Sequence, residues 1–193
     1  MGKNRLEAFS DGVFAIVITI MVLELKRPAS AEFSALLPLI PVFSSYVLSF
    51  VYVGIYWNNH HHLFHATPRV NGTILWANLH LLFWLSLFPF ATAWMGETRV
   101  TAAPTAAYGV VLFMAGLAWY ILQSTIIAAD RAGSSRLKEA LGRDWKGKIS
   151  PVLYLVAIPL AWVNPWITAG LYTLVALIWL VPDRRIERLF ASE

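Results

Sequence analysis

Residues 5–25 read RLEAFSDGVFAIVITIMVLEL and predict a helix that is long and apolar enough to cross a membrane. Asp11 lies near the start of this apolar run. A carboxylate is costly to hold among apolar groups unless it is paired, so Asp11 indicates a functional or structural polar site. The same helix has an apolar stripe along one face, which suits either packing against other helices or the lining of a pore.

The composition places the whole chain in a membrane. Of its 193 residues, 58% are apolar and 13% are charged, and the mean hydropathy is +0.60. A soluble domain of this length does not have that balance. Because one span needs roughly 20 residues, the chain accommodates about six spans and leaves no room for a separate catalytic domain. Cysteine is absent from the sequence, which excludes disulfides and thiol chemistry.

Breaks marked by charge, proline or glycine divide the chain into six predicted helices. They lie near residues 7–25, 33–58, 72–95, 104–128, 150–163 and 166–182. The last two are short and predict a hairpin turned at residues 163–165, with Pro151 starting and Pro159 bending the fifth helix. The expected fold is an all-α integral membrane bundle of six helices, formed as one domain by residues 1–193.

The Lys and Arg residues indicate the orientation, because cytoplasmic loops accumulate positive charge. With the N-terminus inside, twelve of the fifteen lie on the cytoplasmic side, and only Lys26, Arg27 and Arg99 lie outside. We therefore expect a multi-pass protein of the cell membrane with both termini in the cytoplasm. The basic block 131–148 is interpreted as a positive-inside anchor, with attraction to anionic membrane lipids as the alternative. This asymmetry explains the pI near 9.5 without a nucleic-acid partner.

The apolar stripe follows from helical geometry. At 100° per residue, one face of the first helix carries Phe9, Gly12, Ile16, Ile20 and Leu23, with Thr19 close beside it. Asp11 lies about 140° around the helix from Ile16, so it meets different neighbours. Taken alone, the stripe indicates helix packing. Polar partners for Ser10 and Asp11 are available at residues 57–60 of the second helix and at Asn78 of the third.

Three sets of residues together resemble a known family. They are Arg5-x-x-x-Phe9-Ser10-Asp11, then Trp57-x-x-His60-x-x-Leu63-Phe64, then Asn78 followed eleven residues later by Pro89. In these residues the chain is similar to the endolysosomal transmembrane potassium channel family, in its single-repeat prokaryotic form. The resemblance covers the whole six-helix chain in length and hydropathy, but its specific motifs occupy only the first three helices.

The resemblance implies a homotetramer in which each subunit supplies its first helix to a central pore for potassium ions, without a cofactor. It places the hydrophobic constriction at Ile16, further apolar rings at Ile20 and Leu23, and a pore-facing hydroxyl at Thr19. Converging isoleucine side chains can close a pore by expelling water. Since the carbonyl filter sequence of ordinary potassium channels is absent, we expect a leak channel with modest preference for potassium over sodium.

A second expectation is a structural polar cluster that fixes the rotation of the first helix. It lies at the cytoplasmic end of the bundle and consists of Arg5, Phe9, Ser10, Asp11, Trp57, His60 and Asn78.

The histidine-rich segment 60–65 raises the question of a metal site. Consecutive histidines on a helix point in different directions, and only His61 and His65, four residues apart, could share an ion. We therefore expect structural or interfacial histidines and no bound metal.

Two other classes of function were compared with the channel. An enzyme needs paired catalytic groups at one depth, and Asp11, His60 and His80 are the only loose candidates, so we expect no enzyme. The alternative function is a cation- or proton-coupled secondary transporter. Such a protein is expected to have inverted repeats and broken helices, and the sequence shows no convincing repeat and an unbroken first helix.

Overall fold

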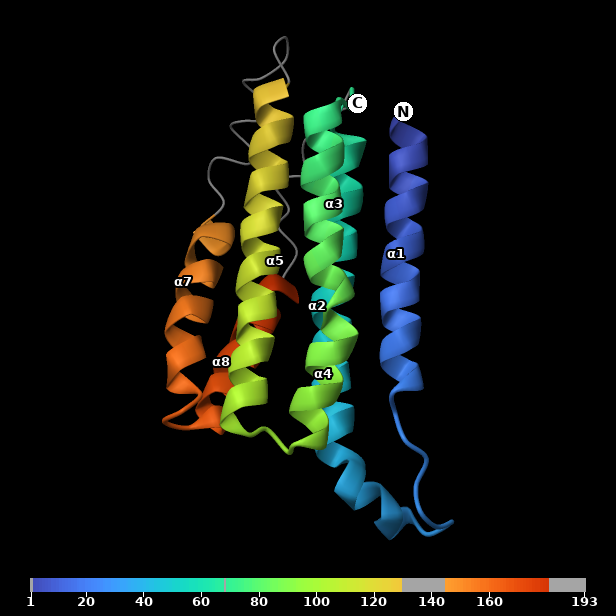
Figure 1. The fold of residues 1–193 in the computed structure, drawn as a ribbon, viewed down its shortest axis with the longest axis vertical. Helices are drawn as coiled ribbons and strands as arrows, with labels where there is room; N and C mark the ends of the chain where they lie inside the picture. The colour runs from blue at the N-terminus through green and yellow to red at the C-terminus, as the bar shows by residue number, and fades with distance from the viewer. Residues whose placement is uncertain (1, 68, 130–144, 181–193) are drawn as a thin grey trace.

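All regular elements are helical in residues 2–67, 69–129 and 145–180, which the computed structural model describes (Figure 1). In chain order they are α1 (Lys3–Leu23), the 3₁₀ helix η1 (Phe33–Leu39), α2 (Ile40–His65), α3 (Gly72–Ser86), α4 (Phe88–Glu97), α5 (Ala102–Ala129), α7 (Trp145–Leu160) and α8 (Pro165–Leu180). The predicted all-α fold is confirmed.

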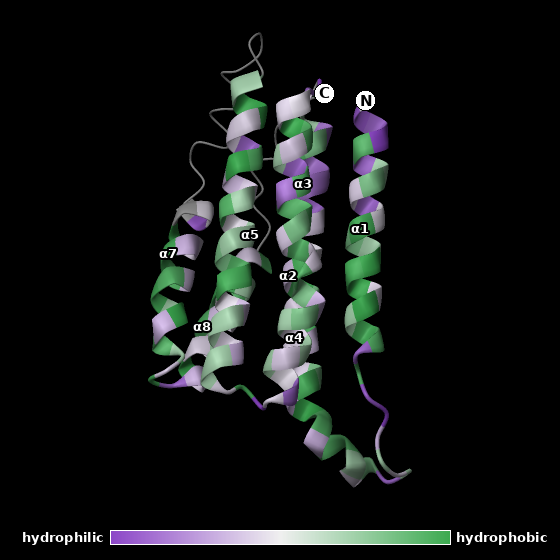
Figure 2. Ribbon diagram, viewed as in Figure 1, coloured by the Kyte–Doolittle hydropathy of each residue, from purple (hydrophilic) through white to green (hydrophobic). Residues whose placement is uncertain are grey.

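Four stretches are long and apolar enough to cross a membrane: Lys3–Leu23, Phe33–His65, Gly72–Glu97 and Ala102–Ala129. Figure 2 shows apolar residues along the length of the helices, with polar residues gathered at their ends. α7 and α8 are also apolar but shorter, and residues 161–164 turn them into the predicted hairpin. The side chain of Asn164 accepts the backbone N–H of Trp166 at 3.0 Å and so begins α8.

Several helix boundaries differ from the prediction, and the predicted helix 33–58 begins as the 3₁₀ helix η1, so that α2 starts only at Ile40. α2 continues to His65 because residues 59–65 contain no proline or glycine that would end it earlier. The predicted helix 72–95 is divided at Leu87, since Pro89 has no N–H to donate to the preceding turn. Pro151 lies inside α7 rather than at its start, which packing against neighbouring helices tolerates in a membrane bundle.

Successive membrane-spanning stretches run in opposite directions, with α3 and α4 continuing in one direction as a single stretch, and α1 stands at one edge of the bundle (Figure 1). α1 packs on α2, α3 and α4, whereas α5 contacts α3, α4, α7 and α8. Lys3 Nζ donates to the backbone oxygen of His65 at 3.1 Å, so the start of α1 meets the end of α2. At the opposite end, Lys26 forms an ion pair with Glu97. We call these the Lys3 end and the Glu97 end. The C-terminus, which is predicted to be cytoplasmic, and most of the basic block 131–148 lie outside the described residues.

Buried hydroxyl groups connect α2, α4, α5 and α8. Ser49 Oγ on α2 lies 2.6 Å from Thr92 Oγ1 on α4 and 2.9 Å from the Tyr108 hydroxyl on α5. The Tyr52 hydroxyl donates to the backbone oxygen of Tyr172 on α8 at 2.6 Å. Each such bond contributes about 0.6 kcal/mol in a membrane protein, so together they supplement the packing that holds the bundle.

The turn between α4 and α5 holds Arg99 in a left-handed conformation, with φ of 54°. The Arg99 N–H donates to the backbone oxygen of Gly96. Glycine is the usual residue at a left-handed position directly after a helix. Because Arg99 is exposed, we expect Arg99→Gly to stabilise the fold by about 1 kcal/mol through relief of this backbone strain. Thermal unfolding in detergent, followed by tryptophan fluorescence, measures the effect. A lower melting temperature for Arg99→Gly would contradict it.

Candidate functional site

α1 has one face against its own bundle and one face directed away from it. The buried face consists of Leu6, Ser10, Phe14, Val17 and Met21. The apolar stripe lies on the other side: Phe9 is 50%, Ile16 59%, Ile20 42% and Leu23 75% exposed. Large apolar side chains directed away from the subunit in this way need another partner, which is lipid, a neighbouring subunit or a dewetted pore.

Thr19 is the polar residue beside the apolar stripe. Its hydroxyl donates to the backbone oxygen of Ala15 at 2.8 Å. Since that bond uses the only hydroxyl proton, Oγ1 keeps acceptor lone pairs on the exposed side of the helix. An oxygen with free lone pairs at this position can replace part of the hydration shell of a cation.

A buried network joins α1, α2 and α3 near the Lys3 end. Asn78 Nδ2 donates to Ser10 Oγ at 2.9 Å, and Asn78 Oδ1 lies 2.8 Å from His60 Nε2. All three side chains are almost completely shielded, at 0–1% exposure. The rings of Phe14 and Phe64 pack on His60, with centroids at 5.5 and 4.5 Å. This buried network fixes both the depth and the rotation of α1.

The remaining members of the predicted polar cluster lie elsewhere. Asp11 and Trp57 are exposed and form a separate pair, in which Trp57 Nε1 donates to Asp11 Oδ1 at 3.0 Å. The Arg5 guanidinium is exposed, with neither a hydrogen bond nor an ion pair to any side chain that the structure describes, and Phe9 is on the apolar stripe. Within one subunit, the cluster is thus two groups because Ser10 and Asp11 point to different sides of α1.

The histidines outside the buried network show no metal geometry. The rings of His61 and His65 stack with centroids 6.1 Å apart. Within residues 2–67, 69–129 and 145–180, three or more metal-binding side chains do not gather anywhere. His80 Nε2 accepts from Trp84 Nε1 at 3.0 Å on α3, so it takes no part with Asp11 or His60.

The ion pair at the Glu97 end was not predicted from the sequence. Lys26 Nζ donates to Glu97 Oε1, which ties the end of α1 to the end of α4 across 71 positions of the chain. The hydrogen bond and the negative charge of Glu97 raise the pKa of Lys26 above its usual value. Both residues are exposed, so this pair contributes little to stability. No sequence pattern relates two charges so far apart.

Comparisons with known proteins agree with this geometry. The family described as endosomal/lysosomal potassium channel TMEM175 matches residues 5–89. A protein of Chryseobacterium sp. (strain P1-3), named as a potassium channel, is 54% identical over 97% of this chain and 97% of its own length. The crystal structure of a lysosomal potassium-selective channel TMEM175 homolog from Chamaesiphon minutus superposes with a TM-score of 0.79 and 29% identity, over 93% of this chain and 96% of that chain. The zebrafish endosomal/lysosomal proton channel TMEM175 is 40% identical over 43% of this chain and 18% of its own length.

The helical membrane fold and these matches define an ion channel of the multi-pass membrane type. The chain belongs to the TMEM175 family, as the resemblance of its first three helices predicted. The family is one of ion channels, which confirms the prediction that the chain is not an enzyme.

Asn78 is the residue on which the buried network depends. We expect Asn78→Leu to destabilise the protein by about 1–3 kcal/mol, because His60 Nε2 loses its partner and stays buried, whereas Ser10 keeps its bond to the Leu6 oxygen. Thermal unfolding measures the loss. Asn58→Leu, an exposed position on α2, is the control and should change little. Equal melting temperatures for the two variants would contradict a structural role of the network.

Proposed function

We propose that the chain is a potassium-permeable leak channel of the cell membrane, with a preference for potassium over sodium, and that residues 1–193 form one channel domain. The observation that carries this proposal is the exposed apolar stripe on α1, a helix at the edge of its own bundle. Membership of a family whose relatives are named as potassium channels supports it.

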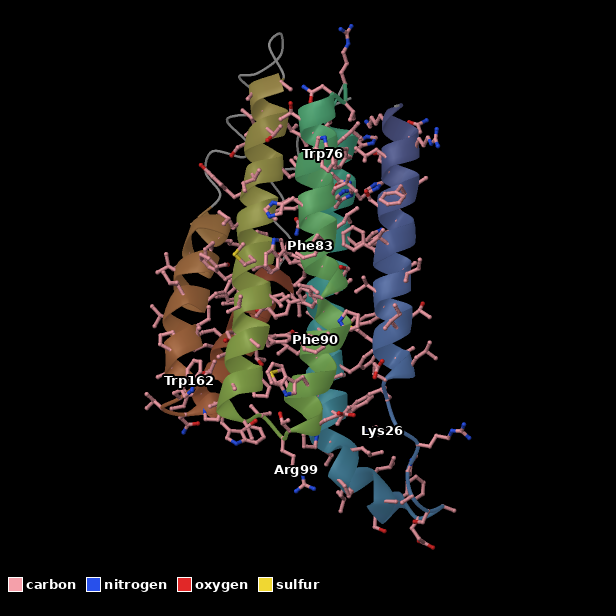
Figure 3. All side chains as sticks on the ribbon, in the orientation of Figure 1. Lys26, Trp76, Phe83, Phe90, Arg99 and Trp162 are labelled. Carbon is pink, nitrogen blue, oxygen red and sulfur yellow. The ribbon has the colours of Figure 1, made fainter. Side chains whose placement is uncertain are left out.

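The proposal requires several copies of the chain. One pore-lining helix cannot enclose a pore, so α1 helices from symmetry-related subunits must meet around an axis. Four subunits are the number that the resemblance implies. Apolar side chains are exposed on the other outer faces as well: Trp76, Phe83 and Phe90 form a row at seven-residue spacing on α3 and α4 (Figure 3). Neighbouring subunits and membrane lipids would cover these faces.

The proposed constriction is formed by Ile16, with Ile20 and Leu23 as further apolar rings. Rings of this kind close a pore by dewetting, and conduction requires them to widen or hydrate. Potassium sheds water at lower cost than sodium, and the Thr19 oxygen would replace part of the lost shell. We therefore propose a modest selectivity rather than that of a carbonyl filter.

We propose that the Lys3 end faces the cytoplasm. In the sequence, this orientation places twelve of the fifteen cationic residues inside and leaves Lys26, Arg27 and Arg99 outside. Both termini are then cytoplasmic. The orientation is tested by protease accessibility of the chain in sealed vesicles, with a tag added after residue 193.

Flux through reconstituted protein tests the function. Liposomes with a potassium gradient should release potassium faster than liposomes with an equal sodium gradient release sodium. Native mass spectrometry of the same preparation should give four chains.

A secondary transporter, the alternative function, would instead need a coupled ion and would show saturating flux. α1, the proposed pore helix, is continuous from Lys3 to Leu23, unlike the broken substrate-binding helices of transporters, and the division of the span Gly72–Glu97 at Leu87 lies outside it. Proton flux, measured in parallel, decides whether the proton conduction named for animal relatives extends to this chain.

A further inference from the structure

Glu24 is the first residue after the exposed apolar stripe. It caps the C-terminal end of α1, directly after Leu23, and is itself exposed. Four residues on a helix correspond to about 40° of rotation, so Glu24 lies close to the line of Ile20 and about 80° around the helix from Ile16. Both residues line one groove of about 550 Å³ between α1 and α4, together with Phe90 and Trp94. The carboxylate therefore lies on the stripe side of α1, at its outer end.

The surrounding charges leave the Glu24 carboxylate available. The other acid of the groove, Glu97, is neutralised by Lys26, whereas the side chain of Glu24 takes part in neither a hydrogen bond nor an ion pair within residues 2–67, 69–129 and 145–180. The negative charge of Glu24 also helps to raise the pKa of Lys26, but less than Glu97 does, and Arg27 and Glu32 follow in the exposed loop with opposite charges. Glu24 is thus an unpaired acid at the Glu97 end.

Helix stability does not explain an acid at this position. The C-terminal end of a helix carries partial negative charge, so a carboxylate there is disfavoured and a basic residue is preferred. The last turn of α1 contains no basic residue. The helix end and the carboxylate therefore produce negative potential at the same place, at a cost in stability, which points to a role outside folding.

We propose that Glu24 attracts cations to the outer mouth of the pore. This inference rests on the proposed function, in which α1 helices surround the axis. Each subunit then contributes one carboxylate and one helix C-terminus to the mouth, above the apolar rings of Leu23 and Ile20. Negative potential at an entrance raises the local concentration of permeant cations and the rate at which they enter. The effect is electrostatic, so salt screens it.

Single-channel conductance in planar bilayers tests the inference at two potassium chloride concentrations. At about 10 mM the Debye length is about 30 Å, and at about 1 M it is about 3 Å. We expect Glu24→Gln to lower the conductance at low salt by about twofold or more and to match the wild type at high salt. Glu24→Lys should also make the current rectify, because only one mouth of the pore changes. Glu32→Gln, which removes an exposed acid from the following loop, is the control and should behave as wild type.

The outcomes separate this inference from the proposed function. If wild-type protein carries potassium current and Glu24→Gln conducts equally at low salt, the role of Glu24 is overturned and the channel stands. A loss of conductance that is the same at both salt concentrations also overturns it, since structural damage is not screened by salt. Wild-type protein that carries no potassium current in verified oligomers overturns both.

Discussion

Replacing Ile16 with asparagine should raise the potassium conductance about tenfold or more and reduce the preference for potassium over sodium. Ile16 is 59% exposed on the face of α1 that its own subunit leaves uncovered. In the proposed pore, an isoleucine ring excludes water, whereas an amide at the same place hydrates it and lowers the barrier to ions. A tenfold rise corresponds to about 1.4 kcal/mol removed from the barrier. Potassium and sodium flux from liposomes measure both changes.

Val22 provides the matched control for this experiment. It is a β-branched apolar residue on the same helix, 43% exposed, but it lies about 120° around α1 from Ile16. Val22→Asn should leave the conductance and the selectivity near those of wild type. If the two variants changed the flux equally, or if Ile16→Asn formed normal oligomers with unchanged flux, the stripe would be a packing surface instead of the pore lining.

Replacing Gly109 with alanine should destabilise the bundle by about 1–3 kcal/mol, the usual cost of overpacking. A Cβ at Gly109 would lie 2.0 Å from the Tyr172 hydroxyl and 3.0 Å from Ile158 Cγ1. Tyr172 would have to move, and its hydrogen bond to the Thr105 oxygen, 3.2 Å in the native structure, would break. The close approach of α5 and α8 therefore depends on this glycine.

Gly116, on the same helix, tests whether the destabilisation comes from the contact with Tyr172 or from placing alanine in α5. A Cβ there would meet nothing nearer than 3.9 Å, so Gly116→Ala should be tolerated or slightly stabilising through its higher helix propensity. Thermal unfolding followed by tryptophan fluorescence compares the variants, with a decrease of several degrees expected for Gly109→Ala alone. Equal shifts for both would show that alanine on α5 acts through something other than Tyr172.

The helices could be predicted from the sequence because hydropathy and helix breakers are local properties. The positions of α1, α5 and the α7–α8 hairpin were close to those in the structure. The continuation of α2 to His65 was missed because polar residues were taken as the end of a membrane span, although a helix can extend beyond the hydrocarbon layer. The kink at Leu87 was missed because Pro89 was treated only as part of a motif.

The candidate site could be predicted only in part. Periodicity placed Ile16, Ile20 and Leu23 on one face, and the structure leaves that face uncovered. It could not separate the buried Ser10–Asn78–His60 network from the exposed Asp11–Trp57 pair, because that division depends on how three helices pack. The Lys26–Glu97 pair depends on a tertiary meeting of two helix ends, for which a single sequence holds no signal.

The two ends of α1 are attached to the rest of the subunit with different strength. The buried network holds the helix at Ser10, whereas an exposed ion pair holds the chain beyond Leu23. Leu23 lies 13 residues from Ser10, about 20 Å along the axis. Between them Met21 is buried and its sulfur accepts only a weak, 3.9 Å hydrogen bond from Thr92 Oγ1, so polar attachment is strongest near Ser10 and a rigid tilt about that point moves the Leu23 end most. A tilt of α1 would therefore displace Leu23 and Ile20 more than Ile16, so the proposed pore would widen first at its outer rings and last at the proposed constriction.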